Sequence, residues 1–401
     1  MVSFELEKTD PYLATESSIS AATVANNEDI LIEILLRLPI KSLLKFKSVC
    51  KQWLSLISNP NFSNLRNPFH TSASGLFLRR KSFLLSPQFD FVDFNHNPIA
   101  APSYAPFKSL PSPSGIKILQ SCNGLLLCSC FQQGNRPKTN YYIYNPTTKQ
   151  YYVLPPFGSS NGGRRILFGV SLAFDPFKSP HYKVVCLQGL GTPGGGDNFQ
   201  FEIYSSDTGT WRVSTSSFSA SGNIQFYGGV YWNGSVHWVS TLGKSMYFKI
   251  DTDQALELPM PPIPNFCHQR KFNYFGESRD HLHLIEIYNL QKLEFNVYEM
   301  EWDYSGWFVK YHVDLDHPRL SFELKGYMFS ILCVVRGESD EDSYLVIHVP
   351  GKVLRFTFQD KTFHNLYDIP TADIDDFDAW CPLRYASTDA YQYIESLACV
   401  R

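Results

Sequence analysis

Two glycine patterns in the chain match motifs that could carry chemistry. Residues 189–194, GLGTPG, have the G-x-G-x-x-G spacing of dinucleotide sites, and residues 158–162, GSSNG, have the G-x-S-x-G spacing of serine hydrolases. Both chemistries need a helix directly after the motif, either to hold the pyrophosphate or to support the nucleophile. Here each motif leads into another β-like segment. The patterns therefore favour polar connections, without nucleotide binding or a serine nucleophile.

The side chains that could bind a metal do not complete a site. The candidates are two groups that lie close together in the sequence, Cys122, Cys128 and Cys130, and His281 and His283. No C-x-x-C or paired-histidine spacing completes a tetrahedral zinc site. The acidic stretches 338–342 and 373–378 lack the spacing of a calcium loop. We expect buried thiols, solvated acidic loops, no metal or cofactor, and no catalytic residue.

Composition favours a large β-rich domain. The chain has 401 residues, of which 15% are aromatic and only 18% charged, with 24 Gly and 25 Pro. A net charge of −3 gives no general attraction to nucleic acid or to an anionic membrane. No signal peptide and no run of about 18 apolar residues is found. Nine scattered cysteines fit a reducing compartment, so we expect the nucleus or the cytoplasm.

Residues 27–62 form the one region with helical periodicity. Asn27 is a good N-cap, and the acids at 28 and 29 suit the first turn of a helix. Apolar residues then recur at helical spacing up to Pro39, which ends the helix. A second apolar set runs from Leu43 to Ile57 and ends at Asn59-Pro60. Two or three short helices are predicted, with more apolar residues than one interior face can bury, so the surplus needs a partner.

The stretch EDILIEILLRLPIKSLLKFKSVCKQWLSLI (28–57) resembles an F-box, the helical module that docks substrate receptors onto the Skp-type adaptor of a cullin–RING ubiquitin ligase. Such modules usually open with Leu-Pro, whereas Asn26-Asn27 stands there in this chain, which puts one adaptor contact in doubt. The resemblance implies that the adaptor is bound by Ile34, Leu35, Leu38, Pro39, Leu43, Val49, Cys50, Lys51 and Trp53. An ordinary core helical hairpin is the alternative.

The same region is locally basic. Five basic residues outweigh three acids, the basic ones being Arg37, Lys41, Lys45, Lys47 and Lys51. Either this is a solvated face, or it meets an acidic surface of a partner.

From residue 75 onward, short strands are separated by Gly, Pro, Asn and Asp. A hairpin form recurs five times, at 141–156, 201–214, 246–262, 295–313 and 352–370. Its marker aromatics, from Tyr144 to Phe356, are spaced by 60, 44, 50 and 58 residues. Each hairpin has a further strand upstream. Repeats of several strands near this period indicate the blades of a β-propeller.

The phrases NGLLLC, YNPTTKQYYVLPP, FGVSLAFDP and YKVV resemble the plant F-box-associated domain, a kelch-like module. The predicted fold is therefore an α+β multidomain chain: a flexible tail (1–26), an F-box helical module (27–70) and an all-β, propeller-like domain of about six blades (75–401). The strand candidate at 391–397 is expected to share a blade with the segment near residue 75, because ring closure removes exposed strand edges.

The two resemblances imply a non-catalytic substrate-recognition subunit of a Skp–cullin–F-box ligase. It would bind the adaptor, through it the cullin and RING subunits, and a protein substrate of unknown identity. The ligase would then promote ubiquitination and degradation of that substrate. The competing hypotheses are an enzyme built on the propeller, and a scaffold outside any ligase that uses the helices for another partner.

Substrate recognition is predicted on the long connections of the propeller. Loops on a rigid scaffold are where recognition usually sits. The b–c loops and the d–a crossovers emerge at the same end of four-stranded blades, and they carry Arg136, Lys138, Arg164, Arg165 and Arg270. Arginine suits carboxylate and phosphate, so an acidic or phosphorylated segment is expected there. A solvated loop face is the alternative.

Overall fold

We describe the fold from a computed structural model of the 401-residue chain. The described residues are 27–66, 72–80, 87–94, 107, 110, 115–132, 138–158, 165–190, 198–219, 224, 226–265, 267–289, 293–315, 329–369 and 383–400. They fall into two compact units, Met1–Pro68 and Phe69–Arg401, each considered by itself. No helix in the described ranges combines the length and the apolar character of a membrane span.

The described part of the first unit, residues 27–66, contains four short helices: α2 (Glu28–Leu36), α3 (Ile40–Phe46), α4 (Lys51–Ser58) and α5 (Pro60–Arg66). Asn27 caps α2 as predicted, because its side-chain oxygen accepts from the backbone N–H groups of Asp29 and Ile30. Pro39 separates α2 from α3.

Two or three short helices were predicted, with the second apolar set ending at Asn59-Pro60, but α5 follows directly as a fourth helix of the described residues. Asn59 and Pro60 end α4 and also begin α5. The Asn59 side chain accepts from the Asn61 N–H at 2.9 Å, and proline at a first helical position has no N–H to leave unpaired.

The second unit is built from six antiparallel sheets. Blade 1 is β3 (Ile116–Cys122), β4 (Leu125–Gln132), β5 (Lys138–Asn145) and β6 (Gln150–Val153). Blade 2 is β7 (Arg165–Ala173), β8 (Lys183–Leu190), β9 (Asn198–Ser205) and β10 (Thr210–Ser219). Blade 3 is β11 (Val230–Trp232), β12 (Ser235–Trp238), β13 (Ser245–Lys249) and β14 (Gln254–Leu258).

Blade 4 is β15 (Phe272–Ser278), β16 (His281–Glu286), β17 (Glu294–Met300) and β18 (Trp307–Asp314). Blade 5 is β19 (Ser330–Val335), β20 (Tyr344–Val349), β21 (Lys352–Thr357) and β22 (Phe363–Asp368). Blade 6 joins β23 (Ala390–Tyr393) from the C-terminus to β1 (Gly75–Arg79) and β2 (Phe89–Asp93).

The innermost strands close a ring. β3, β7, β11, β15, β19 and β23 contact one another in that order, and β23 contacts β3 again. The unit is therefore a six-bladed β-propeller, which confirms the predicted fold class. Lettering each blade a to d from the inside, the five predicted hairpins are the c and d strands of blades 1 to 5. The prediction named no strand for β3, β15 or β19.

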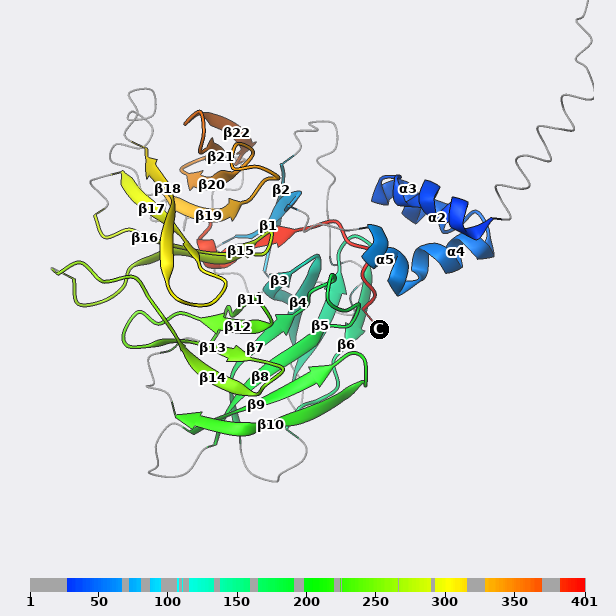
Figure 1. The fold of residues 1–401 in the computed structure, drawn as a ribbon, viewed down its shortest axis with the longest axis horizontal. Coiled ribbons are helices and arrows are strands. Elements are labelled where there is room, and N and C mark those ends of the chain that lie inside the picture. Colours follow the sequence, from blue (N-terminus) through cyan, green and yellow to red (C-terminus); the bar gives the residue numbers. More distant parts are fainter. Residues whose placement is uncertain are drawn as a thin grey trace, which may run out of the picture. The chain divides into compact units, whose positions relative to one another are not determined.

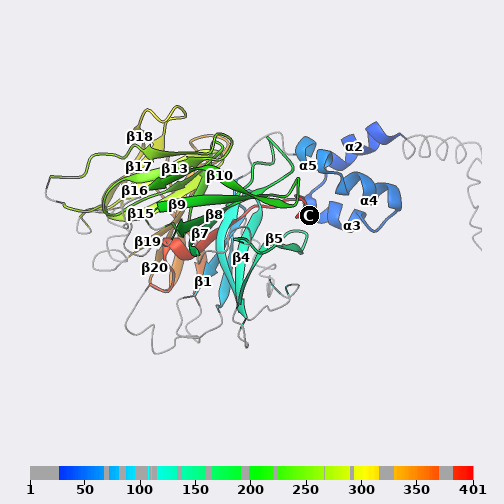
Figure 2. The ribbon, with the colours of Figure 1, turned by 90° about the horizontal axis from the view of Figure 1, so that it is seen from below.

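The ring is closed by pairing the two ends of the β region, as predicted. β1 and β23 are antiparallel, with Phe77 opposite Tyr391, and Figure 1 shows blue β1 beside the red C-terminal strand. Beyond β23 the chain continues past blade 1 (Figure 2), where Asn145 Nδ2 donates to the carbonyls of Ser396 at 3.0 Å and Ala398 at 2.8 Å. The hydroxyl of Tyr182 donates to the Val400 carbonyl.

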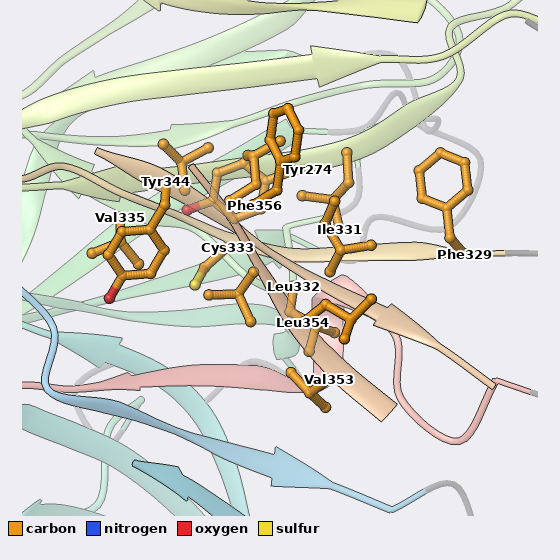
Figure 3. Close-up of a cluster of buried hydrophobic side chains, with 14 of the residues drawn as sticks. Tyr274, Phe329, Ile331, Leu332, Cys333, Val335, Tyr344, Val353, Leu354 and Phe356 are labelled. Carbon is orange, nitrogen blue, oxygen red and sulfur yellow. The ribbon is translucent and has the colours of Figure 1, made fainter. Parts of the chain in front are cut away.

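Apolar side chains fill the spaces between blades. Figure 3 shows one such cluster, in which Tyr274 of blade 4 packs with side chains from three strands of blade 5. Five of the six residues in β19 are buried. An inner strand is covered on both faces by neighbouring blades, so its sequence need not alternate between apolar and polar residues.

We predict that truncating the chain after Asp389 destabilises the whole propeller. The truncation removes buried Tyr391 and Tyr393 and leaves the β1 edge unpaired. Loss of even one buried aromatic side chain costs about 3–5 kcal/mol of unfolding free energy. Thermal unfolding should show a clear fall in Tm. The milder variant Asn145→Ala should lose about 1–3 kcal/mol, because it removes only the tail's hydrogen bonds and the turn's own. A truncated chain that melts like the full chain would contradict this closure.

Candidate functional site

The helical unit separates its apolar residues into an interior and an exposed set. The interior consists of Leu31, Leu35, Ile40, Leu43, Leu56, Ile57 and Phe62. Five other large apolar side chains remain exposed, with no partner chain present: Ile30, Ile34, Val49, Leu54 and Leu65. A unit of this size rarely exposes so much apolar surface unless another protein covers it.

The nine residues predicted to bind the adaptor do not share one environment. Ile34, Pro39, Val49, Cys50 and Lys51 are exposed, and Leu38 and Trp53 are partly exposed. Leu35 and Leu43 have no exposed surface at all. These two residues therefore belong to the core that holds the helices together, and their assignment as contact residues is corrected here.

The turn between α3 and α4 is held in place by its own contacts. Cys50 is the N-cap of α4, and its sulfur accepts from the Trp53 N–H at 3.5 Å. The Trp53 ring meets Phe46 edge to face, with 5.2 Å between the ring centroids. At the other end of the unit, the Arg66 guanidinium donates to the Leu36 carbonyl at 3.0 Å and fixes α5 against α2. The exposed Val49 is thus presented by a defined turn.

Sequence reasoning missed three of the exposed residues, Ile30, Leu54 and Leu65. Ile30 and Ile34 are four residues apart on α2, so they form an exposed stripe beside the buried Leu31 and Leu35. The helical periodicity placed all four residues on one apolar face of the helix and could not decide which of them are buried. Leu65 was missed because α5 was not recognised as a helix.

The exposed basic residues of this unit accompany the apolar set. Arg37 forms a surface ion pair with Glu33 at 3.6 Å, and both side chains are well exposed. Such pairs contribute little to stability. Lys41, Lys45 and Lys51 are exposed as well. The unit therefore exposes basic as well as apolar side chains, and the basic ones suit an acidic partner.

The propeller has two different ends. The a–b and c–d connections lie at one end, here called the turn end, and the b–c and d–a connections lie at the other, here called the loop end. Of the five basic residues predicted to bind substrate at the loop end, Arg136 and Arg164 lie outside the described residues. Lys138 and Arg165 are the first residues of β5 and β7.

Arg270 does not have the predicted exposed position. Its side chain is nearly buried and pairs with Glu286, with 2.9 Å between Nη1 and Oε1. Its Nη2 donates to the Pro261 carbonyl at 2.6 Å. The guanidinium therefore anchors the crossover between blades 3 and 4 and has no free face for a substrate. The prediction that Arg270 binds substrate is wrong.

The other candidate chemical groups are parts of the blade interiors. Cys122, Cys128 and Cys130 are buried, and burial raises the pKa of the Cys122 and Cys128 thiols well above the ordinary value. Neutral thiols in this position neither attack nor bind metal. Among the described residues, no group of three His, Cys, Asp or Glu side chains could hold a metal ion.

His281 and His283, which were considered as metal ligands, share one carboxylate. His281 Nδ1 lies 2.8 Å from Glu299 Oε1, and the fully buried His283 lies 3.5 Å from Oε2. Burial would raise the pKa of Glu299, but the hydrogen bond from His281 and the nearby imidazole of His283 outweigh it and hold that pKa well below the ordinary value. Burial also lowers the pKa of His283. The group links β16 to β17 within blade 4.

Two family models match the chain. The F-box domain matches residues 27–65, which include all nine predicted adaptor residues, and the F-box associated beta propeller domain matches residues 78–257. The second match runs from β1 to the end of blade 3, so blades 4 and 5 lie beyond it.

Several plant proteins are similar to this chain. The F-box protein At5g07610 of Arabidopsis thaliana is 37% identical over 418 residues, covering 95% of this chain and 94% of the relative. The F-box/LRR-repeat/kelch-repeat protein At2g27520 of the same plant is 27% identical, covering 58% of this chain and 60% of the relative. The F-box/kelch-repeat protein At4g19930, also from this plant, is 36% identical over 40% of this chain and 38% of the relative.

We predict that Leu35→Ala destabilises the helical unit and that Ile34→Ala does not. Leu35 is fully buried, so its truncation leaves a cavity and costs about 2–5 kcal/mol, whereas Ile34 is 44% exposed. Urea unfolding followed by helical circular dichroism would measure the difference. Equal midpoints for the two variants would show that the division into interior and exposed sets is incorrect.

Arg270→Ala should destabilise the propeller. Removing one partner of a buried ion pair leaves the charge of Glu286 without compensation, which typically costs about 3–5 kcal/mol. The matched control is Lys244→Ala, since Lys244 pairs with Glu257 at the surface and both side chains are well exposed. Differential scanning fluorimetry should show a lower Tm for Arg270→Ala only. An unchanged Tm would leave Arg270 available for another role.

Proposed function

Because the chain belongs to the F-box proteins that carry an F-box-associated β-propeller domain, we propose that it is the substrate-recognition subunit of a Skp–cullin–F-box ubiquitin ligase. The pairing of an F-box with a propeller is the general architecture of a substrate adaptor. Our proposal adds that the bound target is ubiquitinated and degraded.

One observation carries the adaptor half of this proposal. The helical unit keeps an apolar surface exposed although its interior is already filled by Leu35, Leu43 and their neighbours. That surface is not needed for folding of the unit, and a Skp-type adaptor would cover it. The exposed Lys41, Lys45 and Lys51 of the same unit would favour an acidic adaptor surface and accelerate association.

In the proposed mechanism this chain contributes proximity and no catalytic group. The helical unit binds the adaptor, and through it the cullin and RING subunits. The propeller binds the target. A target lysine is thereby held near a ubiquitin-charged conjugating enzyme, and its effective concentration rises by orders of magnitude. This role requires rigid binding surfaces on the two units.

The direct test is reconstitution from purified components. The full chain should co-purify with the Skp-type adaptor, the cullin and the RING subunit. Proximity labelling in plant cells with the proteasome blocked should then identify targets that accumulate. A deletion of residues 27–66 should lose the ligase subunits and stabilise those targets. Absence of the adaptor from the purified complex would refute the proposal.

Trp53→Ala or Leu38→Asp should abolish adaptor binding. Both side chains are partly exposed, and loss of an aromatic anchor at an interface commonly costs about 2 kcal/mol or more, over tenfold in affinity. Val49→Asp, at a more exposed position, should act in the same way. Pull-down with the purified adaptor measures binding, and circular dichroism checks the fold.

The matched control for these variants is Val153→Asp. Val153 is an exposed apolar residue on the outer strand β6 of the propeller, and its substitution should leave adaptor binding unchanged. Normal binding by Trp53→Ala, Leu38→Asp and Val49→Asp together would place the adaptor elsewhere.

A further inference from the structure

The turn end of the propeller is strongly acidic. The ten a–b and c–d connections of blades 1 to 5 contain twelve Asp or Glu residues and five Lys or Arg residues, a formal charge of −7, although the whole chain carries only −3. The excess is concentrated in the c–d turns of blades 3 and 4 and in the a–b turn of blade 5, residues 250–253, 301–306 and 336–343. The turn residues themselves are therefore mostly acidic, although some of these acids pair with basic residues of the strands, as Asp251 does with Lys183 and Asp253 with Arg212.

The c–d turn of blade 4 differs from those of the other blades. It has six residues, Glu301 to Gly306, whereas blades 1, 2 and 3 use four and blade 5 uses five. Four residues are thus enough to close this hairpin in the same fold. The longer turn carries Trp302, whose side chain is 49% exposed.

Trp302 is held in a fixed position despite its exposure. Its ring packs on Trp232 of blade 3 with 5.1 Å between centroids, and its carbonyl accepts from Asn233 Nδ2 at 3.1 Å. Two residues further on, Tyr304 stacks on Tyr247 at 4.3 Å. The Tyr304 hydroxyl also lies 3.0 Å from Nε2 of the buried His237.

These contacts join the turn to the neighbouring blade. The exposed part of the indole is therefore presented at low entropic cost, because the turn is already ordered before any partner binds.

Two exposed carboxylates flank the indole. Glu301 and Asp303 are its neighbours in the turn, and hydrogen bonds from Ser305 lower the pKa of Asp303. Asp251 is exposed in the adjacent turn of blade 3 and pairs with Lys183. An exposed tryptophan between carboxylates combines the strongest aromatic site for a cation with the charges that attract one.

We propose that a basic segment of the target protein docks on this surface, with an arginine or lysine over the Trp302 indole and its neighbours facing Glu301 and Asp303. The term target protein rests on the proposed function above. An acidic segment, a phosphopeptide or an anionic membrane would be repelled by the exposed Glu301 and Asp303. The site lies at the opposite end of the propeller from the loops where sequence reasoning placed an acidic segment, so the two predictions require segments of opposite charge.

The test is selection of a displayed random peptide library on the purified full-length chain. We expect enrichment of peptides rich in arginine and lysine. Fluorescence polarisation with an enriched peptide should show at least about a tenfold loss of affinity for Trp302→Ala, the usual effect of removing an aromatic anchor. The double variant Glu301→Lys, Asp303→Lys should slow association and weaken its dependence on salt. Because it retains the indole, the double variant tests the site even if Trp302→Ala loosens the turn.

Two matched controls locate the effect. Tyr227→Ala removes an aromatic side chain that is 73% exposed at the loop end, and Asp207→Lys reverses an exposed acid in the c–d turn of blade 2. Neither should change binding of the enriched peptide. Enrichment of acidic peptides, or full affinity of both Trp302→Ala and the double variant, would overturn the proposal.

The outcome is independent of the ligase assignment. Adaptor binding by the helical unit is measured separately by pull-down, and it can fail while basic peptides still bind at Trp302. In that case the docking surface stands and the ligase function falls. If the adaptor binds normally but no basic peptides are selected, the ligase function stands and the docking surface falls.

Discussion

Pairing of β1 with β23 is the constraint on which the propeller depends. Every inner strand must have a neighbour on both sides, and the last gap is closed only when a C-terminal strand enters the blade begun by N-terminal strands. The contacts of the following tail with Asn145 and Tyr182 extend this closure across blades 1 and 2. An unclosed ring would expose strand edges that favour aggregation. The position of every turn, including that of Trp302, follows from the closed ring.

The helical unit has a buried interior and still leaves large apolar side chains exposed. A short helix bundle has little interior, yet Leu35, Leu43 and the residues around them fill it completely. The exposed Ile34 and Val49 lie outside this interior and bury less of their surface than Leu35 and Leu43 do. Buried and exposed apolar side chains lie on different stripes of the same helices, so a substitution in the exposed stripe can leave the interior intact.

Local signals in the sequence were sufficient for much of this fold. The cap at Asn27 and the turn residues of the five c–d hairpins act over a few positions, so the pattern alone identifies them. The a–b turns at Asn123-Gly124 and Asn233-Gly234 have positive φ at both residues, which is the requirement that makes Asn-Gly a hairpin signal.

Other features depend on partners distant in sequence. The other helices, including α5, decide whether Leu35 or Ile34 faces inward. The sequence did not predict α5, because Asn59-Pro60 is a typical end of a helix. Arg270 lies on a connection, and only the folded chain brings it to Glu286. β19 is buried on both faces, so the alternation that would identify a half-buried strand is absent.

The two ends of the propeller differ in the kind of recognition that they can provide. Long loops can adapt to many partners, but ordering them reduces affinity, whereas a turn fixed by packing loses little entropy on binding. The c–d turn of blade 4 is of the second kind: its extra length is stabilised by Trp232, Asn233 and Tyr247 of the next blade. Such contacts with the neighbouring blade are not needed to close a hairpin, because blades 1 to 3 close theirs with shorter turns. These contacts hold the exposed indole of Trp302 in one orientation, which lowers the entropic cost of binding a cation.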